Sequence, residues 1–118
     1  MYRTYLKSKI HGARVTQSDL NYPGSITIDA ALLESAKIDE YEKVQVVNLN
    51  NGARLETYVI CGKKNSGIIG MNGGMARWGY PGDVVLIISY CVLDSEESKR
   101  HKPKIIRVNA SNKIVSKK

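Results

Sequence analysis

The chain has 118 residues and a mass of 13.1 kDa, which suits one domain over residues 1–118 and is too short for two. Hydrophobic residues make up 42% of the chain and charged residues 25%, as in a soluble globular protein. No apolar run approaches the ~20 residues that span a membrane, and the N-terminal residues lack the apolar core of a signal peptide, so we expect a cytoplasmic protein.

The formal net charge of +7 comes from the C-terminal end of the chain. Eight basic and no acidic residues lie between Lys99 and Lys118, whereas Met1 to Ser98 holds ten basic residues against eleven acidic ones. Such a run is usually a solvated tail, which we place at about residues 109–118. The body of the chain is not basic and shows no cluster of aromatic residues, so a basic barrel that binds nucleic acid is the weaker alternative.

The two cysteines, Cys61 and Cys91, each lie in an apolar β-like run, where a free thiol behaves as a small hydrophobic group. We expect both thiols to be reduced and to lie in the core. The chain has two histidines, His11 and His101, and no Cys-x-x-Cys pair, so it offers little for a metal site. We therefore expect no bound metal.

The first predicted strand covers residues 2–15, which mix β-branched, aromatic and basic residues without a helical period. This segment forms either one long strand or two short ones. Residues two apart on a strand share a face, so Lys9 and His11 are expected to project together.

A tight turn is predicted next, at Pro23-Gly24. Pro23 fixes φ at the second position of the turn, and Gly24 supplies the positive φ that a type II turn needs at its third. Ser25 then lies just past the bend, with its hydroxyl close to the Gly24 carbonyl. Taken alone, this is an ordinary Pro-Gly turn into a strand over residues 26–28.

One helix is predicted over residues 30–37, with Asp29 as its N-cap. Asn51-Gly52 is typical of a β-hairpin turn, and residues 70–82 hold five of the ten glycines and are expected to be irregular. The remaining predicted strands cover residues 44–49, 55–61, 68–69, 83–93 and 105–108, with a helical turn over 94–100. Many short strands, one helix and no βαβ alternation predict an all-β chain folded as a small closed barrel.

Chemistry-bearing residues follow one another in a distinctive order between Tyr2 and about Arg107. They are Lys9, His11, Tyr22, Gly24-Ser25, Arg54, Thr57-Tyr58, Asn72-Gly73 and Gly82-Asp83. No single motif is specific, but the ordered set resembles the pyruvoyl-dependent aspartate 1-decarboxylases, which make β-alanine for pantothenate. The resemblance implies a double-psi β-barrel and a homotetramer whose active sites are shared between neighbouring subunits.

Decarboxylation of an α-amino acid leaves a carbanion, and no ordinary side chain is a good electron sink for it. Pyridoxal phosphate needs a lysine and a phosphate cradle, and residues 62–67 do not have the order of a P-loop. The expected cofactor is therefore a covalent pyruvoyl group made from Ser25, with neither metal nor pyridoxal phosphate. In this scheme the Ser25 hydroxyl attacks the Gly24 carbonyl, elimination from the ester cuts the chain, and hydrolysis leaves the pyruvoyl group. The products are residues 1–24 and 25–118.

The resemblance also implies roles for individual residues. Thr57 assists self-cleavage, L-aspartate forms a Schiff base with the pyruvoyl group, and Tyr58 returns a proton to the carbanion. A phenol with a pKa near ~10 stays protonated at neutral pH and fits that task. The substrate-binding residues implied are Lys9, His11, Tyr22, Arg54, Thr57, Asn72, Gly73, Gly74 and Met75. Arg54 suits a carboxylate through two parallel hydrogen bonds, and Lys9 offers a point charge.

Several of these positions also allow a plain structural interpretation. Tyr58 fits the wall of a barrel, Arg54 and Lys9 fit solvated strand positions, and Gly73-Gly74 fits an ordinary glycine loop. Thr57 and Tyr58 are adjacent, so on a regular strand they face opposite sides unless a bulge intervenes or the pocket lies at the strand's end.

Three residues depart from the commonest family pattern. Pro23 stands where a non-proline is usual, and Gly74-Met75 replaces a pair of alanines. These changes bear on cleavage rate and substrate choice. The sequence leaves open whether maturation needs an accessory protein, and an uncleaved barrel that acts as a scaffold or regulator remains the main alternative to the enzyme.

Overall fold

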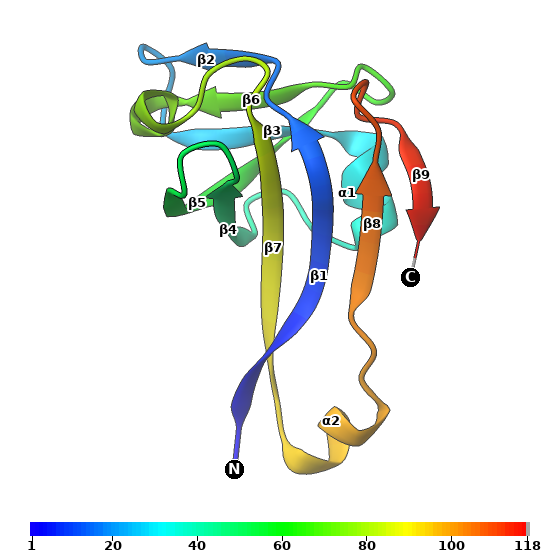
Figure 1. The fold of residues 1–118 in the computed structure, drawn as a ribbon. Coiled ribbons are helices and arrows are strands. Elements are labelled where there is room, and N and C mark those ends of the chain that lie inside the picture. Colours follow the sequence, from blue (N-terminus) through cyan, green and yellow to red (C-terminus); the bar gives the residue numbers. More distant parts are fainter. Residues whose placement is uncertain (118) are drawn as a thin grey trace.

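The computed structural model describes residues 1–117, and β-strands are its main secondary structure, as the sequence predicts (Figure 1). The elements are β1 (Arg3–Arg14), β2 (Gln17–Asp19), β3 (Ser25–Asp29), α1 (Ala30–Ala36), β4 (Lys43–Asn48), β5 (Arg54–Gly62), β6 (Ile69–Asn72), the 3-10 helix η1 (Gly73–Trp78), β7 (Val84–Leu93), α2 (Ser95–Arg100), β8 (Lys104–Val108) and β9 (Ile114–Lys117). The helices of the described residues are all short, and none is long and apolar enough to cross a membrane.

The strands hydrogen-bond in one continuous order, β2-β6-β3-β5-β4-β7-β1-β8-β9. β2 comes first and β1 seventh in this order, yet just Val15 and Thr16 connect them along the chain. Two extended residues reach roughly 7 Å, so the sheet must curl back on itself to bring β2 beside the end of β1. The backbone N–H of Thr16 accordingly donates to the Ile69 carbonyl at 2.8 Å.

The inner side of the curled sheet holds the core. β1 and β8 run parallel, and their paired residues Ile10 and Ile106 are both completely buried. α1 adds Leu32, Leu33 and Ala36 to the same cluster. Along β7 the buried side chains alternate with more exposed ones, which separates an inner from an outer face, whereas β6 is buried throughout.

Local signals in the sequence place the helix and the hairpin correctly. The Asp29 carboxylate accepts a hydrogen bond from the Ala31 N–H at 2.8 Å and caps α1. β4 and β5 pair antiparallel around a turn in which Gly52 has a φ of 77°. Both predictions are confirmed because each depends on residues that are close in the chain.

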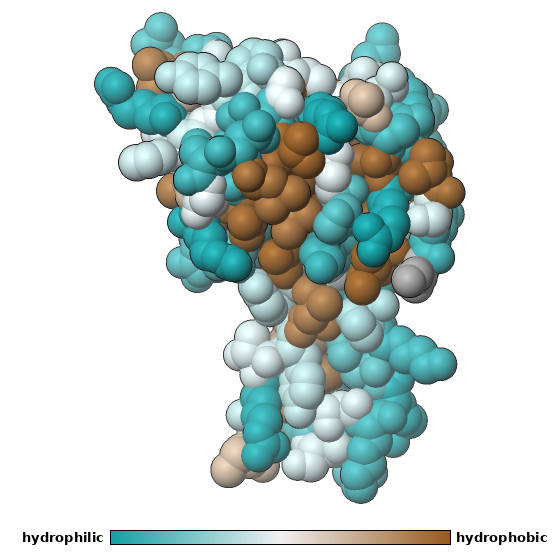
Figure 2. All heavy atoms as spheres, in the orientation of Figure 1, coloured by the Kyte–Doolittle hydropathy of each residue, from teal (hydrophilic) through white to brown (hydrophobic). Residues whose placement is uncertain are grey.

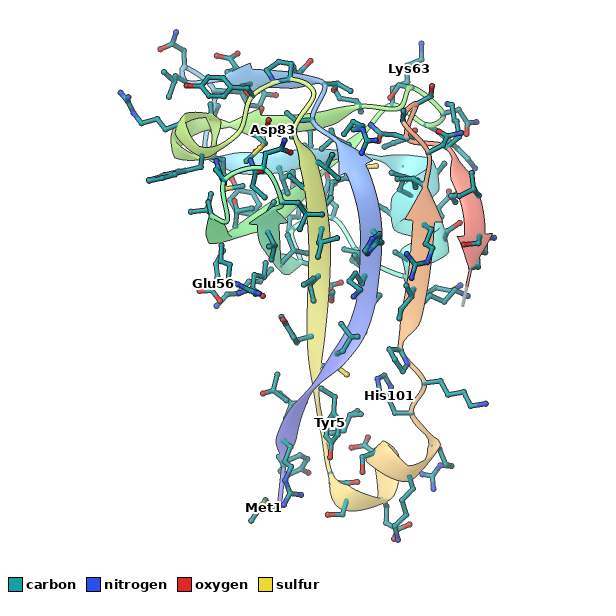
Figure 3. All side chains as sticks on the ribbon, in the orientation of Figure 1. Met1, Tyr5, Glu56, Lys63, Asp83 and His101 are labelled. Carbon is teal, nitrogen blue, oxygen red and sulfur yellow. The ribbon has the colours of Figure 1, made fainter. Side chains whose placement is uncertain are left out.

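β1 and β7 pair along their whole length and extend beyond the body of the molecule, where the N-terminus and α2 lie (Figure 1). At this end the His101 ring lies edge-on to Tyr5, with 6.4 Å between the ring centroids (Figure 3). A ring nitrogen of His101 is also 2.7 Å from the Leu6 carbonyl oxygen. These contacts attach the end of α2 to the first strand.

Some segments differ from the prediction. Residues 70–72 continue β6 and residues 73–78 form η1, so the glycine-rich stretch is more regular than expected. Both cysteines are free, as expected, but Cys61 is exposed and Cys91 is only partly buried, so their placement in the core was wrong. In the segment expected to be a basic tail, residues 114–117 form β9, and Lys118 lies outside the described residues.

Candidate functional site

Ser25 is the first residue of β3 and is only 1% exposed. Its hydroxyl donates to the Pro23 carbonyl at 3.2 Å and accepts a hydrogen bond from the Asn72 amide at 3.0 Å. Asn72 is paired with Ser25 across the β3–β6 ladder, and its amide also donates to Thr27 Oγ1 at 2.9 Å. Two hydrogen bonds and burial therefore hold the Ser25 hydroxyl in one orientation beside the preceding peptide.

The bend before Ser25 is not the predicted type II turn. Gly24 does not have a positive φ, and the backbone N–H of Tyr22 donates to the Asp19 carbonyl at 3.4 Å, so the turn lies earlier in the chain. The Asp19 carboxylate accepts from the Asn21 N–H at 3.0 Å, which closes the bend before Pro23 is reached. A Cβ on Gly24 would meet no atom within 4 Å, so neither φ nor space requires glycine there.

Gly73 is the glycine that the geometry requires. Its φ is 63°, and a Cβ there would lie 2.7 Å from Gly24 Cα and 2.9 Å from the Tyr22 carbonyl oxygen. The backbone at Gly73 is thus packed directly against the backbone at Gly24, which a side chain would prevent. The family resemblance implied that Gly73 binds substrate, and the structure shows that it packs against the peptide that precedes Ser25.

An open hollow of about 360 Å³ lies beside Gly24. Its lining residues are Gly24, Leu55, Glu56, Thr57, Gly74, Met75 and Trp78. Met75 is only 7% exposed and belongs to the core cluster, so its side chain packs inward, whereas Gly74 is exposed. Three of the predicted substrate-binding residues, Thr57, Gly74 and Met75, therefore meet at this hollow.

Tyr58 lines a second, neighbouring hollow together with Lys43, Glu56 and Thr57. The two hollows share Glu56 and Thr57, so they adjoin. β4 and β5 pair from Arg54 to Tyr58 without a register shift, and no bulge turns Tyr58 toward Gly24. Thr57 and Tyr58 therefore face opposite sides of the strand, and the phenol, 39% exposed, points outward.

Lys9 and His11 lie on the outer face of β1, because they alternate with the buried Ile10. Their partners on β7 are the apolar residues Ile88 and Leu86. An apolar area is visible on the face where β7 lies (Figure 2). Burial lowers the pKa of His11, and the positive charges of Arg107 and then Lys9 lower it further. His11 is therefore biased toward the neutral imidazole.

One chain does not bring all the predicted residues together. Gly24, Ser25, Asn72 and Gly73 are in direct contact, and the hollow beside them includes Thr57. The remaining predicted residues, Lys9, His11, Arg54 and Tyr58, do not line that hollow, and Tyr22 contributes its carbonyl next to Gly73. β1 and β3 are not hydrogen-bonded neighbours, because β5, β4 and β7 lie between them in the sheet order.

The residues that support η1 were not predicted as part of the site. The Asn48 side chain is 1% exposed and donates to the Trp78 carbonyl at 2.9 Å and to the Asp83 carboxylate at 3.0 Å. The Tyr80 N–H also donates to Asp83, and these two bonds lower the pKa of that carboxyl, Tyr80 having the larger effect. Together they close the loop that follows Gly73. Asp83 belonged to the ordered set of the sequence, but only the structure shows its partner Asn48.

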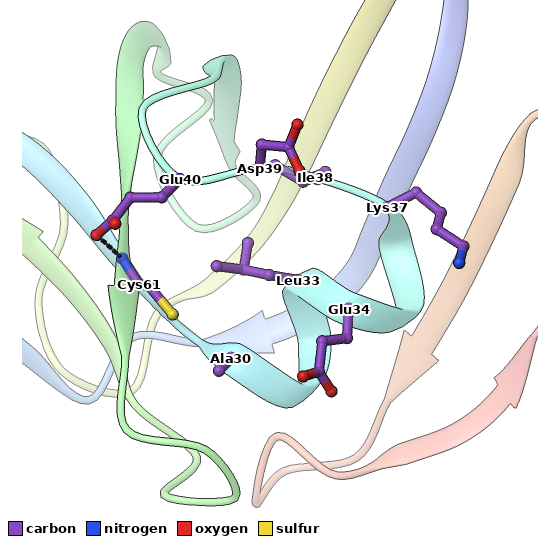
Figure 4. Close-up of a pocket in the computed structure, with 8 residues that line it drawn as sticks. All are labelled: Ala30, Leu33, Glu34, Lys37, Ile38, Asp39, Glu40 and Cys61. Atoms are coloured by element: carbon purple, nitrogen blue, oxygen red, sulfur yellow. Dashed lines mark hydrogen bonds between the residues drawn. The ribbon is translucent and has the colours of Figure 1, made fainter.

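The hollow beside α1 contains none of the predicted residues. It is lined by Ala30, Leu33, Glu34, Lys37, Ile38, Asp39, Glu40 and Cys61 (Figure 4). Glu40 accepts a hydrogen bond from the Cys61 N–H at 3.0 Å, and three of the lining residues are acidic. The hollow beside Gly24 is lined by three further predicted residues, Thr57, Gly74 and Met75, so it is the better candidate.

Comparisons with known proteins agree with the geometry. Residues 1–115 match the family model described as aspartate decarboxylase. A protein of Pelotomaculum thermopropionicum named aspartate 1-decarboxylase is 57% identical over 115 residues, which cover 98% of this chain and 87% of the relative. Proteins with the same name from Clostridium acetobutylicum and Bacillus licheniformis are 56% and 53% identical, each over 114 residues that cover 97% of this chain and 90% of the relative.

Proposed function

The chain belongs to the aspartate decarboxylase family, and from this premise we propose that it converts L-aspartate to β-alanine and CO2, the carboxy-lyase step that feeds pantothenate synthesis. The observation that carries the proposal is the buried Ser25 hydroxyl, held by the Asn72 amide beside a peptide against which Gly73 is packed. A scaffold or regulator has no use for a serine positioned in this way.

We infer that Ser25 generates the cofactor by cutting the chain. Its hydroxyl adds to the Gly24 carbonyl carbon, and the amide becomes an ester when the Ser25 nitrogen leaves. Loss of the Ser25 α-proton and of the ester carboxylate then separates residues 1–24 from residues 25–118, and water converts the dehydroalanine to a pyruvoyl group with release of ammonia. A nucleophile and carbonyl that are held next to each other need little further ordering to react.

The residues around Ser25 fit such a group. The Asn72 amide already donates to the Ser25 oxygen, and Gly73, which has no Cβ, lets its backbone lie directly against the Gly24 peptide. The pyruvoyl group supplies the carbonyl that accepts the electrons left by CO2. Thr57 lines the hollow at Gly24 and is the hydroxyl available to assist cleavage.

The roles assigned to the substrate-binding residues follow from their chemistry. Arg54 and Lys9 provide positive charge for the two carboxylates of L-aspartate, and neither forms an ion pair within the described residues. Tyr58 provides a phenolic proton in the hollow that adjoins the one at Gly24. The separation of Lys9 and His11 from Ser25 on one chain supports an active site completed by a second copy, as in a homotetramer.

The fold that we infer is a closed double-psi β-barrel. The sheet contains three parallel strand pairs among the antiparallel ones: β1 with β8, β2 with β6 and β3 with β5. Parallel pairs need crossover connections, so the strands are not joined by hairpins alone. The two-residue connection from β1 to β2 supports closure of the sheet.

Denaturing mass spectrometry tests the proposal most directly. The mature protein should give two pieces, residues 1–24 and residues 25–118, the larger with a keto acyl group at its N-terminus. Ser25→Ala should give one intact piece and release no CO2 from labelled L-aspartate. An intact wild-type chain, or CO2 release by Ser25→Ala, would contradict the proposal, and the first result would favour the scaffold.

A further inference from the structure

Three side chains with basic groups share the outer face where β1 meets β8. His11 is the direct partner of Arg107 in this parallel ladder, so the two side chains project from the same face. The preceding pair, Ile10 with Ile106, is completely buried and fixes that face as the outer one. Lys9 lies two residues before His11 and projects with it.

None of the three has a partner of opposite charge in the part of the chain described. The ion pairs of residues 1–117 use Lys7, Lys43, Lys64 and Lys99. His11 Nδ1 is buried without a hydrogen-bond partner. The neighbours from the other strands are uncharged: Leu86 faces His11 on β7, and Ser116 faces Arg107 on β9.

Like charges held on one face repel each other, and a buried polar atom without a partner costs free energy. Both costs would be relieved by an anion bound between the side chains. Arg107 suits a carboxylate especially well, because its planar guanidinium presents two parallel N–H groups. Lys9 adds a point charge, and a neutral His11 still has one N–H to donate.

We propose that Arg107 is a further substrate-binding residue, which joins Lys9 and His11 in holding one of the two carboxylates of the substrate. The inference rests on the proposed function, in which Lys9 and His11 bind L-aspartate. It adds a residue from β8, far along the chain from the other site residues. Its side chain is exposed, so a substitution there should leave the fold intact.

The test compares Arg107→Gln with Lys102→Gln, which removes the same charge from an exposed position in the same basic segment. Arg107→Gln should raise KM for L-aspartate about tenfold and change kcat less than about twofold, the pattern of a lost contact that ground state and transition state share. Arg107→Lys should recover part of the loss because it restores the charge without the planar fork. Lys102→Gln should match the wild type, and all variants should still give two pieces by mass spectrometry.

Binding of succinate, a dicarboxylate that cannot be decarboxylated, provides a readout that does not require activity. Its titration should shift the NMR signals of the His11 imidazole in the wild type and in Lys102→Gln, and much less in Arg107→Gln. An equal shift with inorganic phosphate would mean an unselective anion site and would overturn the assignment to a carboxylate.

Other results would also overturn the assignment. One is an unchanged KM together with unchanged succinate binding in Arg107→Gln. The other is an altered oligomeric state of Arg107→Gln by light scattering, which would make Arg107 an interface residue. Succinate binding that depends on Arg107 in a protein that releases no CO2 would contradict the proposed function and support the anion site. The two proposals therefore fail separately.

Discussion

At the scale of single residues, the site depends on how closely two stretches of backbone approach each other. Gly73 lies against Gly24 with a positive φ, and its neighbour Gly74 has neither constraint. Two adjacent glycines thus differ in whether a larger residue could replace them: Gly73 has no room for a side chain, and Gly74 has room. The pair forms a natural control for the importance of this contact.

Gly73→Ala is expected to disrupt the contact with Gly24. A methyl group 2.7 Å from Gly24 Cα cannot be accommodated without a backbone shift, and the positive φ adds strain. We expect a loss of about 1–3 kcal/mol in the free energy of unfolding and much slower self-cleavage. Urea denaturation and a time course of intact mass measure the two effects.

Gly74→Ala should leave both quantities close to the wild-type values, because a Cβ there meets nothing within 4 Å. Gly24→Ala should likewise keep the free energy of unfolding. Equal behaviour of Gly73→Ala and Gly74→Ala would show that the packing of Gly73 on Gly24 is unimportant.

At the scale of secondary-structure elements, Asp29 joins the start of α1 to the loop that precedes β6. Its carboxylate accepts hydrogen bonds of 2.8 Å from the N–H groups of Ala31, Asn65 and Gly67. Burial alone would raise the pKa of Asp29, but these bonds, with Gly67 contributing most, outweigh burial and lower it. The charged form is therefore the one that the folded state stabilises.

A lowered carboxyl pKa contributes stability above the unfolded value, near ~3.9, and this contribution is lost as the pH falls through the lower folded value. Asp29→Asn should therefore reduce the free energy of unfolding at pH 7 and flatten its decline below about pH 4. Thermal unfolding between pH 2 and pH 7 measures both effects.

Asp94 caps α2 through its bond to the Glu97 N–H and serves as the comparison. α2 buries none of its residues, so Asp94→Asn should cost less than Asp29→Asn. An Asp29→Asn protein with the wild-type pH profile would show that the carboxylate charge contributes nothing.

Local patterns in the sequence predicted the elements that depend on neighbouring residues. The cap at Asp29, the Asn51-Gly52 hairpin and the shared face of Lys9 and His11 are of this kind. The bend before Ser25 was missed because the Asp19 carboxylate, not the Pro-Gly pair, closes it. Cys61 was misplaced because an alternating strand alone does not reveal which of its faces a neighbouring strand or helix will cover.

At the scale of the whole molecule, strand order is the property that the sequence could not provide. The pairing of β1 with β8 joins His11 to Arg107 across nearly the entire chain. No spacing or periodicity predicts such a contact, because it results from the way the sheet curls. The ordered set of residues identified the family, yet it could not show that one chain leaves Lys9 and Ser25 apart.

This separation leads to a prediction about mixed assemblies. If the site is completed by a second copy, Ser25→Ala supplies an intact Lys9 face and Lys9→Ala supplies an intact cleavage site. Each variant should be inactive or nearly so alone, and a mixed assembly made by coexpression should release CO2 from L-aspartate because some of its sites combine the two intact halves. Differently tagged copies allow the mixed species to be purified before the assay.

A double variant that carries Ser25→Ala and Lys9→Ala on the same chain is the control. Coexpressed with the wild type, it should give less activity per cleaved chain than the wild type alone. The reason is that some sites then combine the Ser25 of a wild-type subunit with a neighbouring variant subunit that lacks Lys9. Recovery in the mixed assembly of the single variants would show that Lys9 and Ser25 act between subunits. No recovery, with assembly intact by light scattering, would mean that both residues must act on the same chain and that the outer face of β1 has another role.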